Sequence, residues 1–243
     1  MEHEILQNIT EINSRIEESC KKYGRERGEV KLLLATKTVP VEKIKIALKA
    51  GHTLIGENKV QEVKEKYEGL SEIPHESHFI GHLQTNKIKE ILKYGISCIQ
   101  SLDRLDLAIK LNDRLVFENK IIDVLIQVNT SNEDSKFGIA PEELVPLVVA
   151  ISKLERIQIR GLMTIGLFST DHEKVRECFQ LLRTLKEEVE ELQIPGVEMR
   201  ELSMGMSGDL EIAIEEGATI VRVGTAIFGK RVYPDSYYWN ENN

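Results

Sequence analysis

Short β-prone runs recur eight times along the chain, and helix-like segments separate them. The runs are "VKLLLAT" (30–36), "HTLIGE" (52–57), "HFIGHL" (78–83), "ISCIQS" (96–101), "IIDVLIQVN" (121–129), "IQIRGLM" (157–163), "VEMRELSM" (197–204) and "ATIVRVG" (218–224). Helical character is clearest over 41–51, 58–69, 84–95, 101–115, 171–192 and 207–217, and Gly51, Gly95 and Gly217 end three of these segments. Strands that alternate with helices predict parallel pairing through right-handed crossovers.

The number of repeats decides between two parallel architectures. Eight strand–helix units in about 200 residues match the closed (β/α)8 barrel, whereas fewer units suffice for an open doubly wound sheet. No Gly-x-Gly-x-x-Gly pattern follows the first strand, and a helix with Ile5, Ile9, Ile12 and Ile16 on one face precedes it. Such a helix commonly plugs the bottom of a barrel. We predict an α/β fold: a single (β/α)8 TIM barrel with an extra N-terminal helix, residues 1–243 forming one domain.

Charge and cysteine usage limit the partners. The net charge is −8, from 40 acidic and 32 basic residues, which argues against nucleic acid because phosphate backbones need a basic face. The three cysteines are widely spaced, as expected of free thiols in a reducing compartment. The N-terminus is acidic and amphipathic rather than secretory, and no apolar run approaches the ~20 residues of a membrane span. We expect a cytoplasmic protein without a membrane or nucleic-acid partner.

In a barrel, the chemistry lies at the carboxyl ends of the strands. The residues presented there are Thr36–Lys37, Gly56–Glu57–Asn58, Gly81–His82–Leu83–Gln84, Asn129 with the loop to residue 138, Met163–Thr164, "SMGMSGD" (203–209) and "RVGTAIFG" (222–229). Barrels often hold a phosphate between the loops after strands seven and eight. Gly205, Ser207 and Gly208 open one helix there, and Gly224 and Thr225 open the next. Either loop alone is more typical of a capped helix, but together they favour a phosphate site.

Lys37 has two interpretations. A lysine at a strand end can extend its amine to solvent. A lysine that is partly withdrawn from water is instead a nucleophile toward carbonyl compounds and forms Schiff bases. A carbonyl compound that carries a phosphate would suit both ends of such a pocket, and pyridoxal 5′-phosphate (PLP) is one.

The motifs "LLLATKTVP", "GENKVQE", "HFIGHLQTNK", "GLMTIG", "LSMGMSGD" and "VRVGTAIFG" occur in an order that closely resembles the pyridoxal phosphate homeostasis protein family, the YggS/PROSC group, from about residue 5 to residue 231. The resemblance implies a barrel like the N-terminal domain of alanine racemase, with PLP held as a lysine aldimine on Lys37. It implies that Ser207, Gly224 and Thr225 grip the phosphate. It also implies that Asn58 and Met163 lie near the cofactor.

By the same resemblance, Arg222 faces the pyridine nitrogen. Val221 and Val223 stand on either side of it and are expected to face outward, toward the helices. Because side chains alternate along a strand, Arg222 is then expected to face the barrel interior rather than to form a surface salt bridge. Arginine stays protonated, so it keeps that nitrogen unprotonated and weakens the ring as an electron sink.

The resemblance implies a role in PLP homeostasis: a protein that buffers or delivers the cofactor, without efficient catalysis. The alternatives are a low-activity amino-acid racemase and, more distantly, a Schiff-base aldolase acting on a phosphorylated sugar. Because the chain ends after its eighth unit, we expect no second domain to supply the racemase tyrosine, and we expect a monomer that serves PLP-dependent apoenzymes. No tyrosine follows a strand; the six are Tyr23, Tyr67, Tyr94, Tyr233, Tyr237 and Tyr238.

Two further residues have competing interpretations. His82 is the best candidate for a second racemase base, although a lone histidine in a Gly-His-Leu turn is more often a hydrogen-bonding loop residue. Lys136, in the loop 129–138 that is expected to fold over the pocket, is either a second cofactor contact or, more commonly, a solvated charge.

Overall fold

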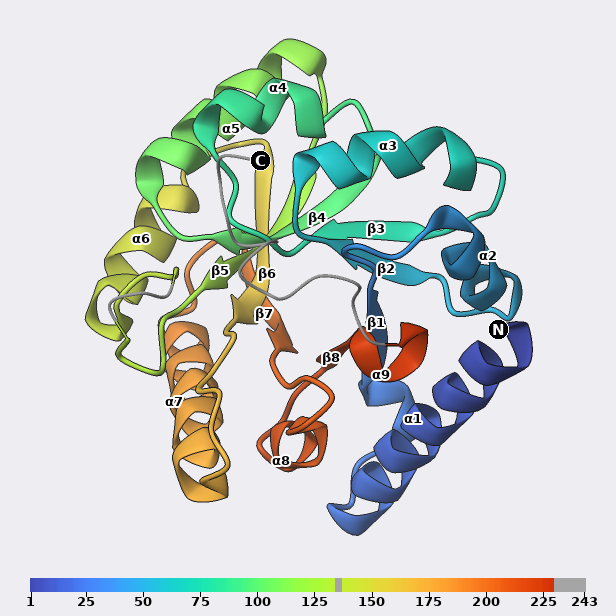
Figure 1. The fold of residues 1–243 in the computed structure, drawn as a ribbon. Coiled ribbons are helices and arrows are strands. Elements are labelled where there is room, and N and C mark those ends of the chain that lie inside the picture. The colour runs from blue at the N-terminus through green and yellow to red at the C-terminus, as the bar shows by residue number, and fades with distance from the viewer. Residues whose placement is uncertain (134–136, 230–243) are drawn as a thin grey trace.

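The computed structural model describes residues 1–133 and 137–229, and its eight strands close into one parallel barrel with β8 beside β1 (Figure 1). The strands are β1 (Lys31–Ala35), β2 (Leu54–Glu57), β3 (Glu76–Phe79), β4 (Ile96–Leu102), β5 (Ile122–Gln127), β6 (Ile157–Met163), β7 (Val197–Ser203) and β8 (Ile220–Val223). The helices are α1 (Glu2–Lys22), α2 (Val41–Lys49), α3 (Val60–Leu70), α4 (Ile88–Ile91), α5 (Leu105–Glu118), α6 (Leu144–Ile151), α7 (His172–Glu191), α8 (Leu210–Glu215) and α9 (Thr225–Phe228). The predicted barrel is confirmed.

The third strand differs from its expected position. It covers Glu76–Phe79 rather than 78–83. Beyond Phe79 the chain leaves the sheet and passes over the end of β2: a Cβ atom at Gly81 would stand 2.0 Å from the carbonyl oxygen of Asn58. The apolar residues Ile80 and Leu83 therefore extend the hydrophobic pattern beyond the end of the paired strand.

Two helices also differ from expectation. The segment 84–95 forms only one short α-helix, α4, preceded by a 3-10 turn over Thr85–Lys87. Helix α6 was not predicted, because its run "LVPLVVAI" is rich in β-branched residues and contains Pro146. That proline lies in the first turn of α6, where its missing N–H has no intrahelical partner to lose.

The expectation that the N-terminal helix plugs the barrel bottom is wrong. Helix α1 lies outside the barrel, against α2, α8 and α9 (Figure 1). Ile5, Ile9, Ile12 and Ile16 are its buried face. Because α8 has six residues and α9 has four, they leave the wall beside β8 thinly covered, and α1 fills that part of the helical layer. A paired ionic contact fixes its position: Arg15 donates to both carboxylate oxygens of Glu211, at 2.7 and 2.9 Å.

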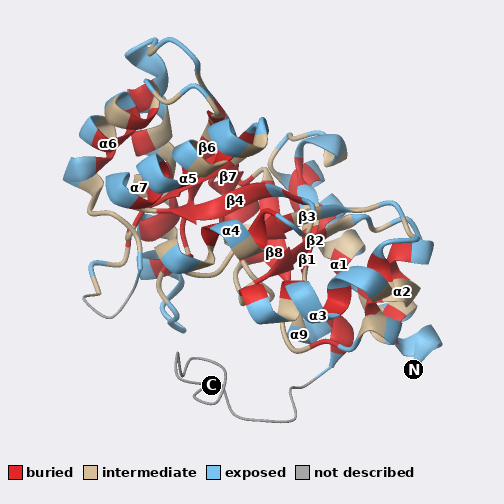
Figure 2. Cartoon of the chain, turned by 90° about the horizontal axis from the view of Figure 1, so that it is seen from above, coloured by how far each residue is buried: buried red, intermediate tan, exposed pale blue. Residues whose placement is uncertain are grey.

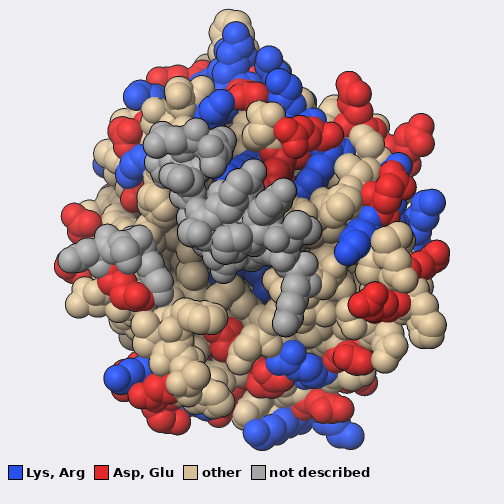
Figure 3. Space-filling model, in the orientation of Figure 1, with Lys and Arg blue, Asp and Glu red and all other residues tan. Residues whose placement is uncertain are grey.

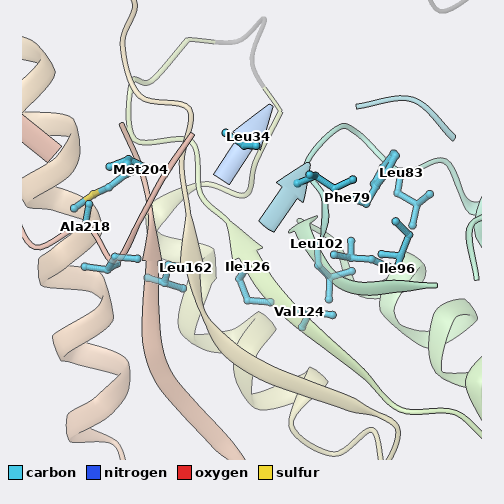
Figure 4. Packing of buried hydrophobic residues seen from close by; sticks show 14 of the residues in the cluster. Leu34, Phe79, Leu83, Ile96, Leu102, Val124, Ile126, Leu162, Met204 and Ala218 are labelled. Atoms are coloured by element: carbon cyan, nitrogen blue, oxygen red, sulfur yellow. The ribbon is translucent and has the colours of Figure 1, made fainter. Parts of the chain in front are cut away.

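Hydrophobic packing forms two separate cores. The larger core lies between the strands and the helices, and Figure 4 shows part of it, with Leu34 of β1, Phe79 of β3, Ile126 of β5 and Leu162 of β6. Figure 2 shows the buried strands surrounded by helices with one buried and one exposed side. The second core lies inside the barrel and consists of Leu33, Cys98, Leu125, Met163 and Ile220. Buried polar side chains, among them Arg222, Ser203 and Gln100, share the barrel interior with this small core.

The three cysteines are buried, and no disulfide joins any of them in the described ranges. Within those ranges, none of the helices is long and apolar enough to cross a membrane. On the face drawn in Figure 3, acidic and basic side chains intermingle around the rim.

Candidate functional site

Lys37 follows β1 directly, in a turn at the carboxyl end of the barrel, and its side chain is half-buried. Its two neighbours are tightly held. Thr36 is fully buried, and its hydroxyl donates to Glu57 Oε1 at 2.6 Å. Thr38 adopts a left-handed backbone with φ of +65°, and its amide donates to Glu62 Oε2 at 2.5 Å. The backbone on both sides of Lys37 is therefore fixed by side chains from the next strand–helix unit.

Lys66 of α3 joins these contacts into one group. Its ammonium group donates to the carbonyl oxygen of Thr36 at 2.8 Å, to Glu57 at 2.7 Å and to Glu62 at 2.7 Å. Only 9% of Lys66 is exposed, so three acceptors compensate for a buried cation. We call Thr36, Glu57, Glu62 and Lys66 the Lys66 cluster. Glu57, which was expected at the barrel mouth, faces α3 instead.

The Lys66 cluster holds two carboxylates and one ammonium group. Burial raises the pKa of Glu57 to about 7, against the opposing effect of Lys66. Its second oxygen, Oε2, is buried without a hydrogen-bond partner in the described part of the chain. Glu57 is therefore poised between its charged and neutral forms near neutral pH.

Arg222 lies inside the barrel, as its parity predicts: Val221 and Val223 belong to the outer core, while Arg222 is 6% exposed. Its guanidinium donates to Ser203 Oγ and to the carbonyl oxygen of Thr164, both at 2.7 Å. Burial lowers its pKa to about 10, partly offset by Asp209, so it remains a cation at neutral pH. Both hydrogen-bond partners are neutral. A guanidinium has five donors, and further ones remain for an acceptor at the barrel mouth.

The loop after β7 is organised by Asp209. The N-cap of α8 is Asp209 rather than Ser207. Its carboxylate accepts the amide of Met206 at 2.5 Å, and burial raises its pKa. Ser207 is half-buried, and its carbonyl oxygen accepts from Arg15 at 2.9 Å.

The loop after β8 packs against β1. A Cβ atom at Gly224 would stand 2.7 Å from the carbonyl oxygen of Ala35, two residues before Lys37. Gly224 caps α9, and Thr225, its first residue, is exposed. Among the described residues, none of the recorded hydrogen bonds uses the amides of Ser207, Gly208, Gly224 or Thr225. These donors suit an anion such as a phosphate.

Asn58 and Met163 differ in burial. Asn58 follows β2, is half-buried, and its backbone lies against Gly81. Met163 ends β6 and is 1% exposed within the interior core. It forms part of the apolar core inside the barrel and is in register with Ser203 of β7.

His82 stacks on Phe137, with ring centroids 4.1 Å apart, and its Nδ1 lies 3.8 Å from Asp103. Phe137 belongs to the loop after β5, and its carbonyl oxygen accepts from Gln127 at 3.1 Å. The loop after β5 therefore contacts the segment that follows β3 through this stacking. Lys136 lies outside the described residues.

The sequence reasoning missed the Lys66 cluster and the partner of Arg222, Ser203. One signal was available. Lys66 is spaced three residues after Val63 and four before Leu70, on the buried face of its helix. A lysine at a core-facing helical position needs buried acceptors.

Fold and site together define a class: a (β/α)8 barrel with a lysine after its first strand, a buried arginine on its last, and open amides in the two final loops. The family model for the alanine racemase N-terminal domain matches residues 13–232. The pyridoxal phosphate homeostasis protein of Aquifex aeolicus is 43% identical over 227 residues, which cover 93% of this chain and 98% of that protein. This chain belongs to the alanine racemase N-terminal domain family and, within it, to the pyridoxal phosphate homeostasis proteins.

Two solved structures extend the comparison. PipY of Synechococcus elongatus, solved with PLP bound, is similar with a TM-score of 0.78 and 32% identity, covering 88% of this chain and 100% of that one. Alanine racemase of Clostridium difficile has a TM-score of 0.77 at 16% identity and covers 96% of this chain but 58% of its own. The second likeness concerns the fold alone.

Proposed function

We propose that this protein binds PLP and acts in PLP homeostasis, holding the cofactor reversibly for buffering or delivery to PLP-dependent apoenzymes. Two relatives support this: the Aquifex protein carries that name, and PipY was solved with PLP bound. The observation that carries the proposal is Arg222, a buried cation whose recorded hydrogen bonds go to neutral partners at the end of the barrel that Lys37 follows.

The residues fit the cofactor by donor type. Arg222 offers N–H donors to an unprotonated ring nitrogen. A phosphate would find donors in the hydroxyls of Ser207 and Thr225 and in four backbone amides, those of Ser207, Gly208, Gly224 and Thr225. When bound, the group supplies an aldehyde that condenses reversibly with a lysine amine. Lys37 supplies that amine, and the Lys66 cluster holds its backbone. Asn58, which is half-buried after β2, would lie near the ring substituents, and Met163 would supply apolar surface from the interior core.

We also propose that the chain works as a single-domain monomer in the cytoplasm.

A racemase needs acid–base groups on both faces of the substrate carbon. In the described ranges, Tyr67 and Tyr94 lie against each other, 5.3 Å between centroids, on α3 and just after α4. His82 is stacked on Phe137. A reversible carrier is therefore the function that these side chains support best.

A spectroscopic titration tests the proposal. Adding PLP to the purified protein should produce the absorption band of a lysine-bound cofactor, and Lys37→Ala should abolish it. Lys49→Ala, an exposed lysine at the end of α2, is the matched control and should behave as wild type. Mixing the loaded protein with a PLP-dependent apoenzyme should restore that enzyme's activity. An unchanged band in Lys37→Ala, or rapid racemisation of a free amino acid by the loaded protein, would overturn it.

A further inference from the structure

Five polar side chains form a continuous network through the barrel interior. Arg222 of β8 donates to Ser203 Oγ of β7 at 2.7 Å, and Ser203 Oγ donates to Gln100 Oε1 of β4 at 2.6 Å. Gln100 Nε2 lies 2.7 Å from His78 Nδ1 of β3, and His78 Nε2 lies 2.8 Å from Glu76 Oε1. We call these five residues the interior network. It crosses from β7 directly to β4, so it spans the barrel rather than following the sheet.

The donors of the interior network all point the same way. Arg222 has only donors, so the Ser203 oxygen accepts and its single proton passes on to Gln100. Gln100 must then present its carbonyl oxygen to Ser203 and its NH2 group to His78. His78 Nδ1 therefore accepts, which leaves the proton on Nε2 to donate to Glu76. An ionised glutamate has only acceptors, so the far end requires the same direction.

Burial makes this arrangement expensive unless every member is satisfied. Gln100 and Ser203 are fully buried, and His78 is 6% exposed, while Glu76 reaches solvent at the opposite end. Unpaired polar groups at such positions are strongly unfavourable, whereas complete networks rigidify the groups they hold. The only charged group of the network near the barrel mouth is Arg222. Its geometry is thus determined by Ser203 and Gln100 on one side and by Thr164 on the other.

We propose that Gln100 is a positioning residue, which acts through Ser203 to hold the Arg222 guanidinium in the orientation that keeps the cofactor's ring nitrogen unprotonated. This role rests on the proposed function. The network itself, and the tautomer that it imposes on His78, do not depend on a bound cofactor.

The first experiment uses the protein without cofactor. With 15N-labelled histidine, the resonances of His78, assigned by their loss in His78→Gln, should show a neutral ring protonated at Nε2 at neutral pH. A ring protonated at Nδ1, or at both nitrogens, would overturn the network's direction.

The second experiment uses PLP labelled with 15N at the ring nitrogen. Wild type should show an unprotonated nitrogen, and Gln100→Met should shift the resonance toward the protonated form. Gln127→Met is the matched control, because Gln127 is equally buried inside β5 but bonds to Phe137 instead. Its resonance should remain that of wild type.

Ser203→Ala serves as the smaller change if Gln100→Met fails to fold, and it should shift the resonance in the same direction. The double variant Ser203→Ala/Gln100→Met should shift it no further than Ser203→Ala alone, because both act along one route. A wild-type resonance in folded Gln100→Met, or additive shifts in the double variant, would overturn the positioning role. Wild-type protein that takes up no cofactor would overturn the proposed function and this role with it, while the histidine measurement would still decide the network.

Discussion

The ammonium group of Lys66 lies 2.8 Å from the carbonyl oxygen of Thr36, the residue that precedes Lys37. A buried lysine on α3 thereby fixes the strand end that carries the candidate attachment residue. The same ammonium group donates to Glu57 and to Glu62, and Glu62 in turn accepts the amide of Thr38. The backbone beside Lys37 is thus held by the neighbouring unit, while the Lys37 side chain is half-buried.

Replacing Lys66 with methionine should destabilise the protein strongly. The change keeps the apolar stem but leaves the buried carboxylate of Glu57 and the half-buried one of Glu62 without their cation, a loss of about 3–5 kcal/mol in the free energy of unfolding. The measurement is urea denaturation. Lys64→Met on the same helix is the control: Lys64 is exposed and 4.0 Å from Glu90, so its loss should be at most about 1 kcal/mol. Equal losses in the two variants would contradict the role of the Lys66 cluster.

Glu57 should make stability fall as pH rises toward 7. Burial raises the pKa of Glu57 from its ordinary 4.5 to about 7 in the folded protein, so the folded state binds more protons than the unfolded chain between these pH values. Stability linked to this group is present below pH 4.5 and is lost as pH rises through 7, by at most about 3 kcal/mol. Unfolding measured from pH 4.5 to 8 should show this decline relative to Glu57→Gln. Parallel pH profiles of the two proteins would count against it.

Gly224→Ala should weaken PLP binding and lower thermal stability. The new Cβ would stand 2.7 Å from the Ala35 carbonyl oxygen, so either β1 or the loop after β8 must move. We expect a loss of about 1–3 kcal/mol in stability. Gly28→Ala, which meets nothing within 4 Å, is the control and should match wild type in both calorimetry and PLP titration. Wild-type affinity in Gly224→Ala would show that this contact does not shape the site.

Ser207→Ala and Thr225→Ala should each weaken PLP affinity without unfolding the protein. Each removes one hydroxyl donor to the phosphate, at about 1.5–3 kcal/mol of binding free energy. Ser71→Ala, at the exposed end of α3, is the control. If the double variant Ser207→Ala/Thr225→Ala bound PLP as tightly as wild type, the phosphate assignment would be wrong.

Much of the fold was predictable from the alternation of strand and helix patterns. The inward orientation of Arg222 was predictable too, because successive side chains of a strand point to opposite faces of the sheet. Val221 and Val223 pack in the core between strands and helices, so Arg222 between them faces the barrel interior. The strand ends also placed Lys37, Asn58, Ser207 and Gly224 at one end of the barrel, since parallel strands share their direction.

The rest depended on distances that no local pattern contains. The position of α1 followed from the shortness of α8 and α9, which leaves β8 uncovered. The orientation of Glu57 followed from a lysine nine positions later on the next helix. Ser203 and Gln100 are 103 positions apart and meet only because the barrel closes.

We propose that the cofactor binds covalently to Lys37. The most direct test is to load the protein with PLP, reduce it with borohydride, digest it and locate the modified lysine by mass spectrometry. The label should lie on the peptide that contains Lys37 and should be absent from Lys37→Arg, which keeps the charge but not the nucleophile. A label on another lysine, or equal labelling of Lys37→Arg, would contradict it.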